Sequence, residues 1–499
     1  MQIRESAKDI DVYDSVDVLI AGGGIAGCTA AITAARAGAR TLLIERNGCL
    51  GGVLTSGIIP NIVNAYIDLK GFHHISGIPL EIMQALAKCN GCSQNWSESF
   101  SKLVVDEQKL KVVLIELLQK SGVKIWTHVV AASPIMEGNS VKGLFIETKI
   151  GRKAVLAKTT IDCTGEADIA AQTGCPLRVT PGTASLAFKM SNVDGDVFCR
   201  YFKDHPEEFP VYRDGVRGLD DFVLNWEKYG IFYFPHRGGR EWPLVQRAVS
   251  AGEYSKTMGK TFGLDMMHLM GLESLHDVAV NSMLWRLPSL SPEDISEAEL
   301  ETQKVCFYIA EFFQKKIPGF SHAHVSQISQ DLGIRVSRGI VGVETFDINM
   351  LTSTHPVYFD DTIGCRSARP WKDDGNLDHP FDKDNEGQVS VQSVKGQATA
   401  DGKFVYGHTV DIPYGIILPQ NVDNLLVGSG KAVSAVPQTL LRCGVNSMIP
   451  AQAAGTAAAC AADSGKNVRD VDIRSVQRLL LSQGVFLGSD DRLAKLGLN

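Results

Sequence analysis

Three glycines near the N-terminus have the spacing of a loop that binds a dinucleotide. Gly22, Gly24 and Gly27 form the pattern G-x-G-x-x-G directly after the apolar run Val16–Ala21. Such a loop turns tightly and brings backbone N–H groups close to a diphosphate, so a side chain at Gly24 would collide with the ligand. Glu45 ends the next apolar run, where an acidic group accepts hydrogen bonds from a ribose hydroxyl. The expected cofactor contacts are therefore Gly22, Gly24, Ile25, Ala26, Gly27 and Glu45.

A second glycine pair, Gly51 and Gly52, follows shortly after Glu45. Its flexible backbone suits an extended cofactor that continues from the diphosphate toward a ring, which favours FAD over NAD. Arg46 and Thr55 lie in the same segment and are expected to contact this cofactor. An NAD dehydrogenase is the alternative, because the first glycine motif serves both cofactors, and it predicts a colourless protein.

Several residues farther along the chain are candidates for the substrate side. Arg335 and Arg338 lie three residues apart in a glycine-flanked segment, so they could face one cavity and bind a carboxylate or polarise a carbonyl. A structural ion pair is the alternative for both. His408 is a candidate acid or base, because imidazole exchanges protons near neutral pH, and a structural histidine is its alternative. Tyr414 and Arg442 are further candidates for the substrate face.

The cysteines and histidines predict no metal site. Eleven cysteines are scattered along the chain, an odd count that fits free thiols in a reducing compartment, so we expect a cytoplasmic protein. Cys89 and Cys92 have C-x-x-C spacing, which could serve redox exchange or half of a zinc site. Two unpaired thiols are the preferred interpretation, since no second C-x-x-C follows. His322 and His324 lack nearby carboxylates that would support a metal.

Strands and helices alternate in the first third of the chain, as in an α/β fold. A helix of small residues is expected after the first glycine loop, with Gly38 at its end. Apolar periodicity predicts further elements. These are strands at Thr41–Glu45, Val123–His128, Val141–Thr148 and Ala154–Ala157, and a helix at Val105–Gln119.

The texture changes near residue 186, where aromatic residues, prolines and long polar loops replace the α/β alternation. Within this stretch Pro292–Lys316 predicts a long helix, because Ser291 suits the N-cap and lysines lie in the last turn. The α/β pattern resumes with an expected strand at Asn424–Gly428 and an Ala-rich helix at Pro450–Ala462. We expect a Rossmann-type FAD-binding domain (1–185 and 402–465), an inserted α+β substrate domain (186–401) and C-terminal capping helices (466–499).

Composition limits the class of partner. The chain has 499 residues, a formal net charge of -7 and 44% hydrophobic residues, enough apolar material for more than one core. The acidic balance argues against a nucleic-acid partner, which needs clustered Lys and Arg. The polar start, Met1 to Asp17, differs from a secretory signal, and no stretch predicts a membrane span. The expected partner is a small-molecule substrate, a homo-oligomer is compatible with the sequence, and the electron acceptor is not indicated.

These segments resemble FAD-dependent oxidoreductases with the glutathione-reductase type of fold, close to the succinate dehydrogenase and fumarate reductase flavoproteins. The resemblance covers both ends of the chain. It rests on the segments Val18–Gly27, Glu45–Gly57, Ile161–Asp168, Gly333–Arg338, Asn424–Gly430 and Gln452–Ala458.

The resemblance implies positions for both halves of FAD. Thr164 and Gly165 would lie beside the adenosine, Val130 would contact the adenine, and Gly428 would lie near the diphosphate. The late Ala-rich helix, opened by Pro450, would contain the cofactor contact Gln452 and aim its N-terminus at the flavin pyrimidine edge. A helix N-terminus carries partial positive charge, so it would raise the flavin reduction potential. The alternative is an Ala-rich helix that only packs against the sheet.

Two positions depart from the family pattern. Relatives carry Arg after the glycines of the late strand, whereas this chain has Lys431, which cannot make a planar bidentate phosphate contact. His73 and His74 lie where some relatives attach flavin, but their surroundings do not match, so non-covalent FAD is expected. The resulting hypothesis is a soluble dehydrogenase or reductase that transfers hydride between flavin N5 and a small polar substrate bearing a carbonyl or carboxylate. The alternatives are an oxidase acting on an alcohol or amine, and an FAD-binding electron-transfer subunit.

Overall fold

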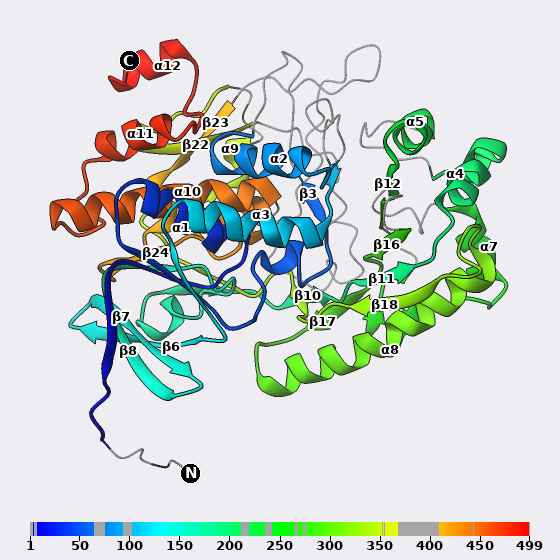
Figure 1. Cartoon of the computed structure of the whole chain (residues 1–499), viewed down its shortest axis with the longest axis horizontal. Coiled ribbons are helices and arrows are strands. Elements are labelled where there is room, and N and C mark those ends of the chain that lie inside the picture. Colours follow the sequence, from blue (N-terminus) through cyan, green and yellow to red (C-terminus); the bar gives the residue numbers. More distant parts are fainter. Residues whose placement is uncertain are drawn as a thin grey trace.

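The computed structural model shows a large α/β unit joined to a region of antiparallel sheets and helices (Figure 1). We call the first the main unit and the second, residues 182–334, the inserted region. The structure describes residues 3, 7–63, 75–92, 102–210, 219–234, 242–264, 268–272, 276–351, 353, 355–367, 409–442 and 444–498.

A seven-stranded sheet forms the centre of the main unit, in the order β5-β2-β1-β8-β7-β6 with β24 paired to β8. Its parallel part places β1 between β2 and β8. The last residues of β1, Val18 to Ala21, are fully buried, as expected for a parallel strand covered on both faces. The strands are β1 (Val12–Ala21), β2 (Thr41–Glu45), β5 (Lys124–Thr127), β6 (Val130–Glu137), β7 (Ser140–Thr148), β8 (Gly151–Asp162) and β24 (Leu425–Val427).

Helices of small residues lie against this sheet. The helix α1 (Ile25–Arg36) packs closely on α10 (Gly444–Ser464), since a Cβ at Gly455 would lie 2.1 Å from the Ala30 carbonyl oxygen. The helices α2 (Ile78–Lys88) and α3 (Glu107–Lys120) lie beside them (Figure 1). The Ala-rich sequence of α10 is therefore a requirement of close helix packing.

The inserted region contains two five-stranded sheets, in the orders β13-β14-β17-β10-β19 and β12-β15-β16-β11-β18. The long helix α8 (Pro292–Lys316) lies along this region (Figure 1), and the Ser291 hydroxyl oxygen accepts a hydrogen bond from Asp294 N at its start. The other helices are α4 (Gly195–Asp204), α5 (Leu219–Tyr229) and α7 (Pro243–Ser250). The strands are β10 (Gly182–Ser185), β11 (Phe188–Ser191), β12 (Ile231–Phe234), β13 (Thr257–Met258), β14 (Thr261–Phe262), β15 (Leu269–Leu272), β16 (Asp277–Val280), β17 (Leu284–Leu287), β18 (His324–Ile328) and β19 (Gly333–Ile334).

Small sheets and the C-terminal helices complete the main unit. Buried side chains between Ile340 and Ile363 pack in its core, together with those of the late segments. The elements are β3 (Asn61–Val63) with β4 (Lys102–Val104), β9 (Leu177–Val179) with β20 (Arg338–Ile340), β21 (Phe346–Asp347) with β25 (Ala435–Val436), β22 (Thr362–Ser367) with β23 (Thr409–Pro413), and the helices α9 (Ile348–Leu351), α11 (Ile473–Ser482) and α12 (Asp490–Leu496).

The expected α/β fold with a Rossmann-type βαβ unit is confirmed, and Thr41–Glu45 and Pro292–Lys316 have the predicted bounds. The predicted strand Ala154–Ala157 is too short, because β8 continues to Asp162 through buried threonines. The domain limits stay a prediction. Within the described segments, none of the helices combines the length and apolar character needed to cross a membrane.

The late helix was predicted to open at Pro450, and this is wrong, because α10 begins at Gly444. Proline costs one backbone hydrogen bond inside a helix. Burial of Val445, Met448 and Ile449 in the main core stabilises the turns before it.

Candidate functional site

The first glycine loop, between β1 and α1, is shaped by contacts within the protein. Gly22 has a φ of +100°, and a Cβ there would lie 2.6 Å from the Cys163 carbonyl oxygen. A Cβ at Gly27 would lie 1.8 Å from the Gly22 carbonyl oxygen. Both glycines are therefore needed for the chain to fold into this loop.

Gly24 differs from its two neighbours in the motif. It has an ordinary extended backbone (φ -64°, ψ 177°), and apart from its adjacent chain residues a Cβ there would meet no described atom within 4 Å. Internal packing therefore gives no reason for glycine at this position. In α1, all of which the structure describes, the first turn has no acidic residue and no side-chain cap. The N–H groups at this helix start fit a diphosphate, and a side chain at Gly24 would enter the space that it needs.

Glu45 holds the glycine loop and the following turn together. Its Oε2 accepts a hydrogen bond from Gly23 N at 2.6 Å, and its Oε1 accepts one from Asn47 N at 2.8 Å. A Cβ at Gly23 would lie 2.9 Å from the Cβ of Glu45. The G-x-G-x-x-G pattern does not include Gly23, so its role was not predicted from the sequence. The run of three glycines, Gly22 to Gly24, was a signal that this position also requires glycine.

The second glycine loop lies directly on the first. Gly51 N donates to Gly23 O at 2.9 Å, and a Cβ at Gly52 would lie 3.1 Å from the Gly24 Cα. Both glycines have positive φ, +97° and +55°. The Thr55 hydroxyl is buried and donates to Leu50 O at 2.5 Å, so this side chain stabilises the loop.

Arg46 and Val130 lie at the edge of this site. Arg46 pairs with Asp331 at 2.8 Å, and its side chain is 64% exposed. Val130 begins β6 and is exposed, and the preceding Val129 N donates to Glu45 O at 2.9 Å. The structure therefore brings Val130 close to the end of β2.

Asp162 organises a third loop, a role that its residue type and position in the sequence did not predict. Its carboxylate accepts hydrogen bonds from Thr164 N at 3.0 Å and Thr164 Oγ1 at 2.7 Å, and from the N–H groups of Ile169 and Ala170 at 3.0 Å. Burial raises the pKa of Asp162, against these hydrogen bonds. Gly165, which follows Thr164 in this loop, has a φ of +103°.

Lys431 and Arg338 both bind the loop that follows Asp162. Lys431 Nζ forms an ion pair with Glu166 and donates to Ile334 O at 2.8 Å. Arg338 Nε donates to Glu166 O at 2.6 Å, and its guanidinium forms an ion pair with Asp168. Lys431 is therefore a link between loops in this chain.

Arg335 has different partners from Arg338. Its guanidinium lies 3.3 Å from Ser185 Oγ and 3.5 Å from Asn281 Oδ1, both in the inserted region. Its backbone N–H donates to Thr183 O at 2.8 Å. Arg335 therefore contacts the inserted region, whereas Arg338 contacts the loop after Asp162 and forms the ion pair that its alternative interpretation predicted.

Gly428 and Gln452 are both close-packed. A Cβ at Gly428 would lie 2.8 Å from Cys163 Sγ, and its N–H donates to Asp162 O. The Gln452 side-chain oxygen accepts a hydrogen bond from Ile78 N at 2.8 Å, at the start of α2. Gln452 thus caps a neighbouring helix.

The remaining candidates are only partly described. His408, His73 and His74 lie outside the described residues. The Tyr414 hydroxyl is buried and donates to Val468 O at 2.8 Å, and burial raises the pKa of this phenol, which suits a structural role. Arg442 lies half-buried just before α10.

The thiols Cys89 and Cys92 are both free, one exposed and one buried. In the part of the chain that the structure describes, no group of three or more His, Cys, Asp or Glu side chains could hold a metal ion.

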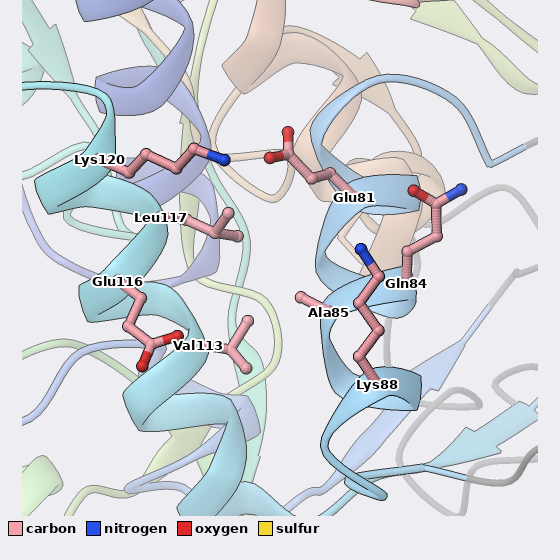
Figure 2. Close-up of a pocket in the computed structure, with 8 residues that line it drawn as sticks. All are labelled: Glu81, Gln84, Ala85, Lys88, Val113, Glu116, Leu117 and Lys120. Carbon is pink, nitrogen blue, oxygen red and sulfur yellow. The ribbon is translucent and has the colours of Figure 1, made fainter.

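A groove of about 210 Å³ lies between α2 and α3, and its lining includes no residue of the two glycine loops. Figure 2 shows the Glu81 and Lys120 side chains pointing toward one another across it. Glu81 also pairs with Arg36 at 2.5 Å. The groove is lined by side chains on the surfaces of these two helices, and we give it no role in the reaction.

The family comparison agrees with this loop arrangement. The profile of the FAD dependent oxidoreductase family matches residues 17–480, from β1 to α11. The chain belongs to the FAD dependent oxidoreductase family. FAD is its cofactor, as the two glycine loops predicted, and the chain is an oxidoreductase enzyme.

Two solved structures are distantly similar to this family member. A geranylgeranyl bacteriochlorophyll reductase-like protein of Thermoplasma acidophilum is 14% identical, with 97% of this chain and 90% of that chain covered and a TM-score of 0.45. The p-nitrophenol 4-monooxygenase of Pseudomonas putida is 11% identical, with 97% and 92% covered and a TM-score of 0.40. No curated protein matches the chain. These likenesses do not indicate a substrate.

Proposed function

We propose that this FAD dependent oxidoreductase transfers hydride between flavin N5 and a small polar substrate that bears a carbonyl or carboxylate. The observation that carries the proposal is the open space beside Gly24, at the N-terminus of α1, where no protein atom requires a glycine. A bound diphosphate explains that glycine and fixes the direction in which the cofactor extends.

The protein's own groups would hold FAD through main-chain amides at the α1 start and through Glu45. A carboxylate that accepts one N–H at each oxygen keeps further lone pairs, so Glu45 can also accept from a ribose hydroxyl. Thr55 and Gln452 would act through the loops and helices that they stabilise. The proposed cofactor-binding residues are Gly22, Gly24, Ile25, Ala26, Gly27, Glu45, Arg46, Gly51, Gly52, Thr55, Val130, Thr164, Gly165, Gly428 and Gln452.

The substrate would bind between the main unit and the inserted region. FAD supplies the hydride chemistry when bound, and the chain must orient the substrate and handle its proton. Arg335 is the proposed group for a substrate carboxylate or carbonyl, because it lies in a half-buried polar cluster with Ser185 and Asn281. Arg338 would position the Thr164–Gly165 loop. His408 is proposed for proton exchange because of its imidazole.

The test is anaerobic reduction of the purified yellow protein by a panel of small hydroxy acids, keto acids, alcohols and amines. Substrate-linked bleaching of the flavin, lost in Arg335→Met and retained in the control variant Arg247→Met, is the expected result, since Arg247 lies on α7 with its side chain 62% exposed.

Three results would contradict this proposal. A reduced flavin that reacts rapidly with oxygen would indicate an oxidase. A protein that retains FAD but is bleached only by a partner protein would indicate an electron-transfer subunit. An Arg335→Met variant with unchanged substrate affinity would remove Arg335 from the site.

A further inference from the structure

Asn61 is a buried amide without a partner. It begins β3, the residue is 2% exposed, and among the residues that the structure describes neither its Oδ1 nor its Nδ2 has a hydrogen-bonding partner. Buried polar groups are almost always hydrogen-bonded, because leaving one unpaired destabilises the fold. A carboxamide with both ends unpaired therefore indicates a ligand.

The strand register shows where this amide points. Asn61 lies directly opposite Val104 in the antiparallel pair of β3 and β4, and opposed residues share one face of a sheet. Val104 packs with Ile58 against Met270 and Ala279 of the inserted region. Asn61 therefore faces the junction between the main unit and the inserted region.

This junction lies beyond the second glycine loop along the chain. Glu45 is beside Gly23 at the start of the cofactor path, whereas the Gly51–Gly52 loop lies on Gly24 and leads along the chain to Asn61. β3 contacts α10, and β4 contacts β12 and β15 of the inserted region. Figure 1 shows β3 on the side of the main unit nearest the inserted region. A cofactor that extended from Gly24 past Gly52 toward β3 would bring its ring to this junction.

We propose that Asn61 binds the flavin ring of FAD, with its amide paired to the pyrimidine edge where a C=O lies next to an N–H. A carboxamide offers one acceptor and two donors, which complements such an edge. Val104, the residue opposite Asn61 in the strand pair, belongs to an apolar cluster and offers the amide no competing side-chain hydrogen bond. This inference rests on FAD as the cofactor and is independent of the proposed hydride transfer.

The test compares two variants that each remove a buried, unpartnered polar group. Asn61→Leu should weaken FAD binding about tenfold or more, the loss of one to two hydrogen bonds, while the apoprotein melts at an equal or higher temperature. Thr261→Val is the matched control, because the Thr261 hydroxyl is also buried without a described partner but lies in β14 of the inserted region. It should leave FAD affinity unchanged.

A second variant keeps the test decisive if Asn61→Leu does not fold. Asn61→Asp keeps the shape, removes the donors and adds negative charge, so it should weaken FAD binding and lower the reduction potential of the bound flavin. Wild-type FAD affinity with only a raised KM would assign Asn61 to the substrate, and a destabilised apoprotein with unchanged FAD affinity would make it structural. Either result overturns the proposal, and neither depends on whether turnover occurs by hydride transfer.

Discussion

The main unit and the inserted region are stabilised in different ways. In the main unit, helices and loops approach one another through glycine and alanine, as at Gly27 and Gly455, where a Cβ would meet a backbone oxygen about 2 Å away. In the inserted region, aromatic side chains fill the core. The Phe198 ring centroid lies 5.0 to 6.2 Å from those of Phe202, Phe222, Phe232, Phe234, Trp242 and Phe320.

This difference explains why the main unit has a sequence motif that predicts its structure, whereas the inserted region does not. A close backbone approach permits only glycine, so the residue type itself reports the geometry. An aromatic core tolerates many combinations of similar volume, so its sequence reports burial alone. The following variants test this contrast, from the largest expected effect to the smallest.

Gly27→Val should abolish folding of the main unit. Its Cβ would lie 1.8 Å from the backbone oxygen of Gly22, and neither backbone can move without displacing β1. Circular dichroism and thermal melting should show no cooperative transition of the wild-type kind. A variant with wild-type melting behaviour would show that packing does not require this glycine.

Phe198→Ala should destabilise the inserted region by about 3–5 kcal/mol, because it leaves a cavity among six rings. FAD affinity should change little, since the glycine loops belong to the other core. Phe307→Ala is the control, because Phe307 is 57% exposed on α8 and should change stability little. Calorimetry and FAD titration measure the two effects, and a parallel loss of both would contradict independent cores.

Lys189→Met should weaken the junction of the two regions by about 3–5 kcal/mol. The Lys189 ammonium, on β11, forms a buried ion pair with Glu107 at the start of α3 and lies 3.4 Å from Asp277. Removing it leaves the Glu107 carboxylate buried without its counter-charge. Denaturant unfolding should show this loss, and Lys189→Met with Glu107→Leu should restore part of it. A double variant as unstable as the single one would contradict this explanation.

Gly24→Val should leave the apoprotein folded and reduce FAD affinity about 10- to 100-fold, the cost of forcing extra atoms into a packed site. Its backbone φ of -64° suits any residue, and apart from the adjacent chain residues no described atom lies within 4 Å of the Cβ position. Equilibrium titration of the apoprotein with FAD measures the change. A yellow variant with wild-type affinity would place the diphosphate elsewhere.

Asp17→Asn should have the smallest effect, about 1 kcal/mol at neutral pH, because the ion pair is partly solvated. Burial raises the pKa of Asp17, but hydrogen bonds from Arg40 and Lys158 outweigh it and lower the pKa from 3.8 to about 2. Stability from a lowered carboxyl pKa is present above pH 3.8 and is lost as the pH falls through 2. Wild type and variant should therefore differ at pH 7 and converge near pH 2 in urea unfolding. A difference that is constant with pH would exclude this ion pair as the cause.

Periodicity and capping residues determined many local elements in advance. The helix Pro292–Lys316 has its predicted ends because Ser291, the first-turn acids and the last-turn lysines all act within the helix itself. The start of α10 could not be predicted in this way, because burial of Val445 and Met448 against distant strands outweighs the proline. The contacts of Arg335 with Ser185 and of Arg338 with Glu166 likewise depend on chain segments 150 and 172 residues away.

The amino-acid sequence by itself determined the βαβ unit, the two glycine loops and FAD as the cofactor, because each depends on residues that are near one another in the chain and on backbone geometry that only glycine allows. The tertiary structure alone decided which charges pair and which polar groups stay unpaired. Lys431 forms an ion pair with Glu166, Glu45 accepts a hydrogen bond from Gly23, and the Asn61 amide has no described partner. These outcomes depend on tertiary structure, because residues that are distant in the sequence come together only when the strands and helices have packed.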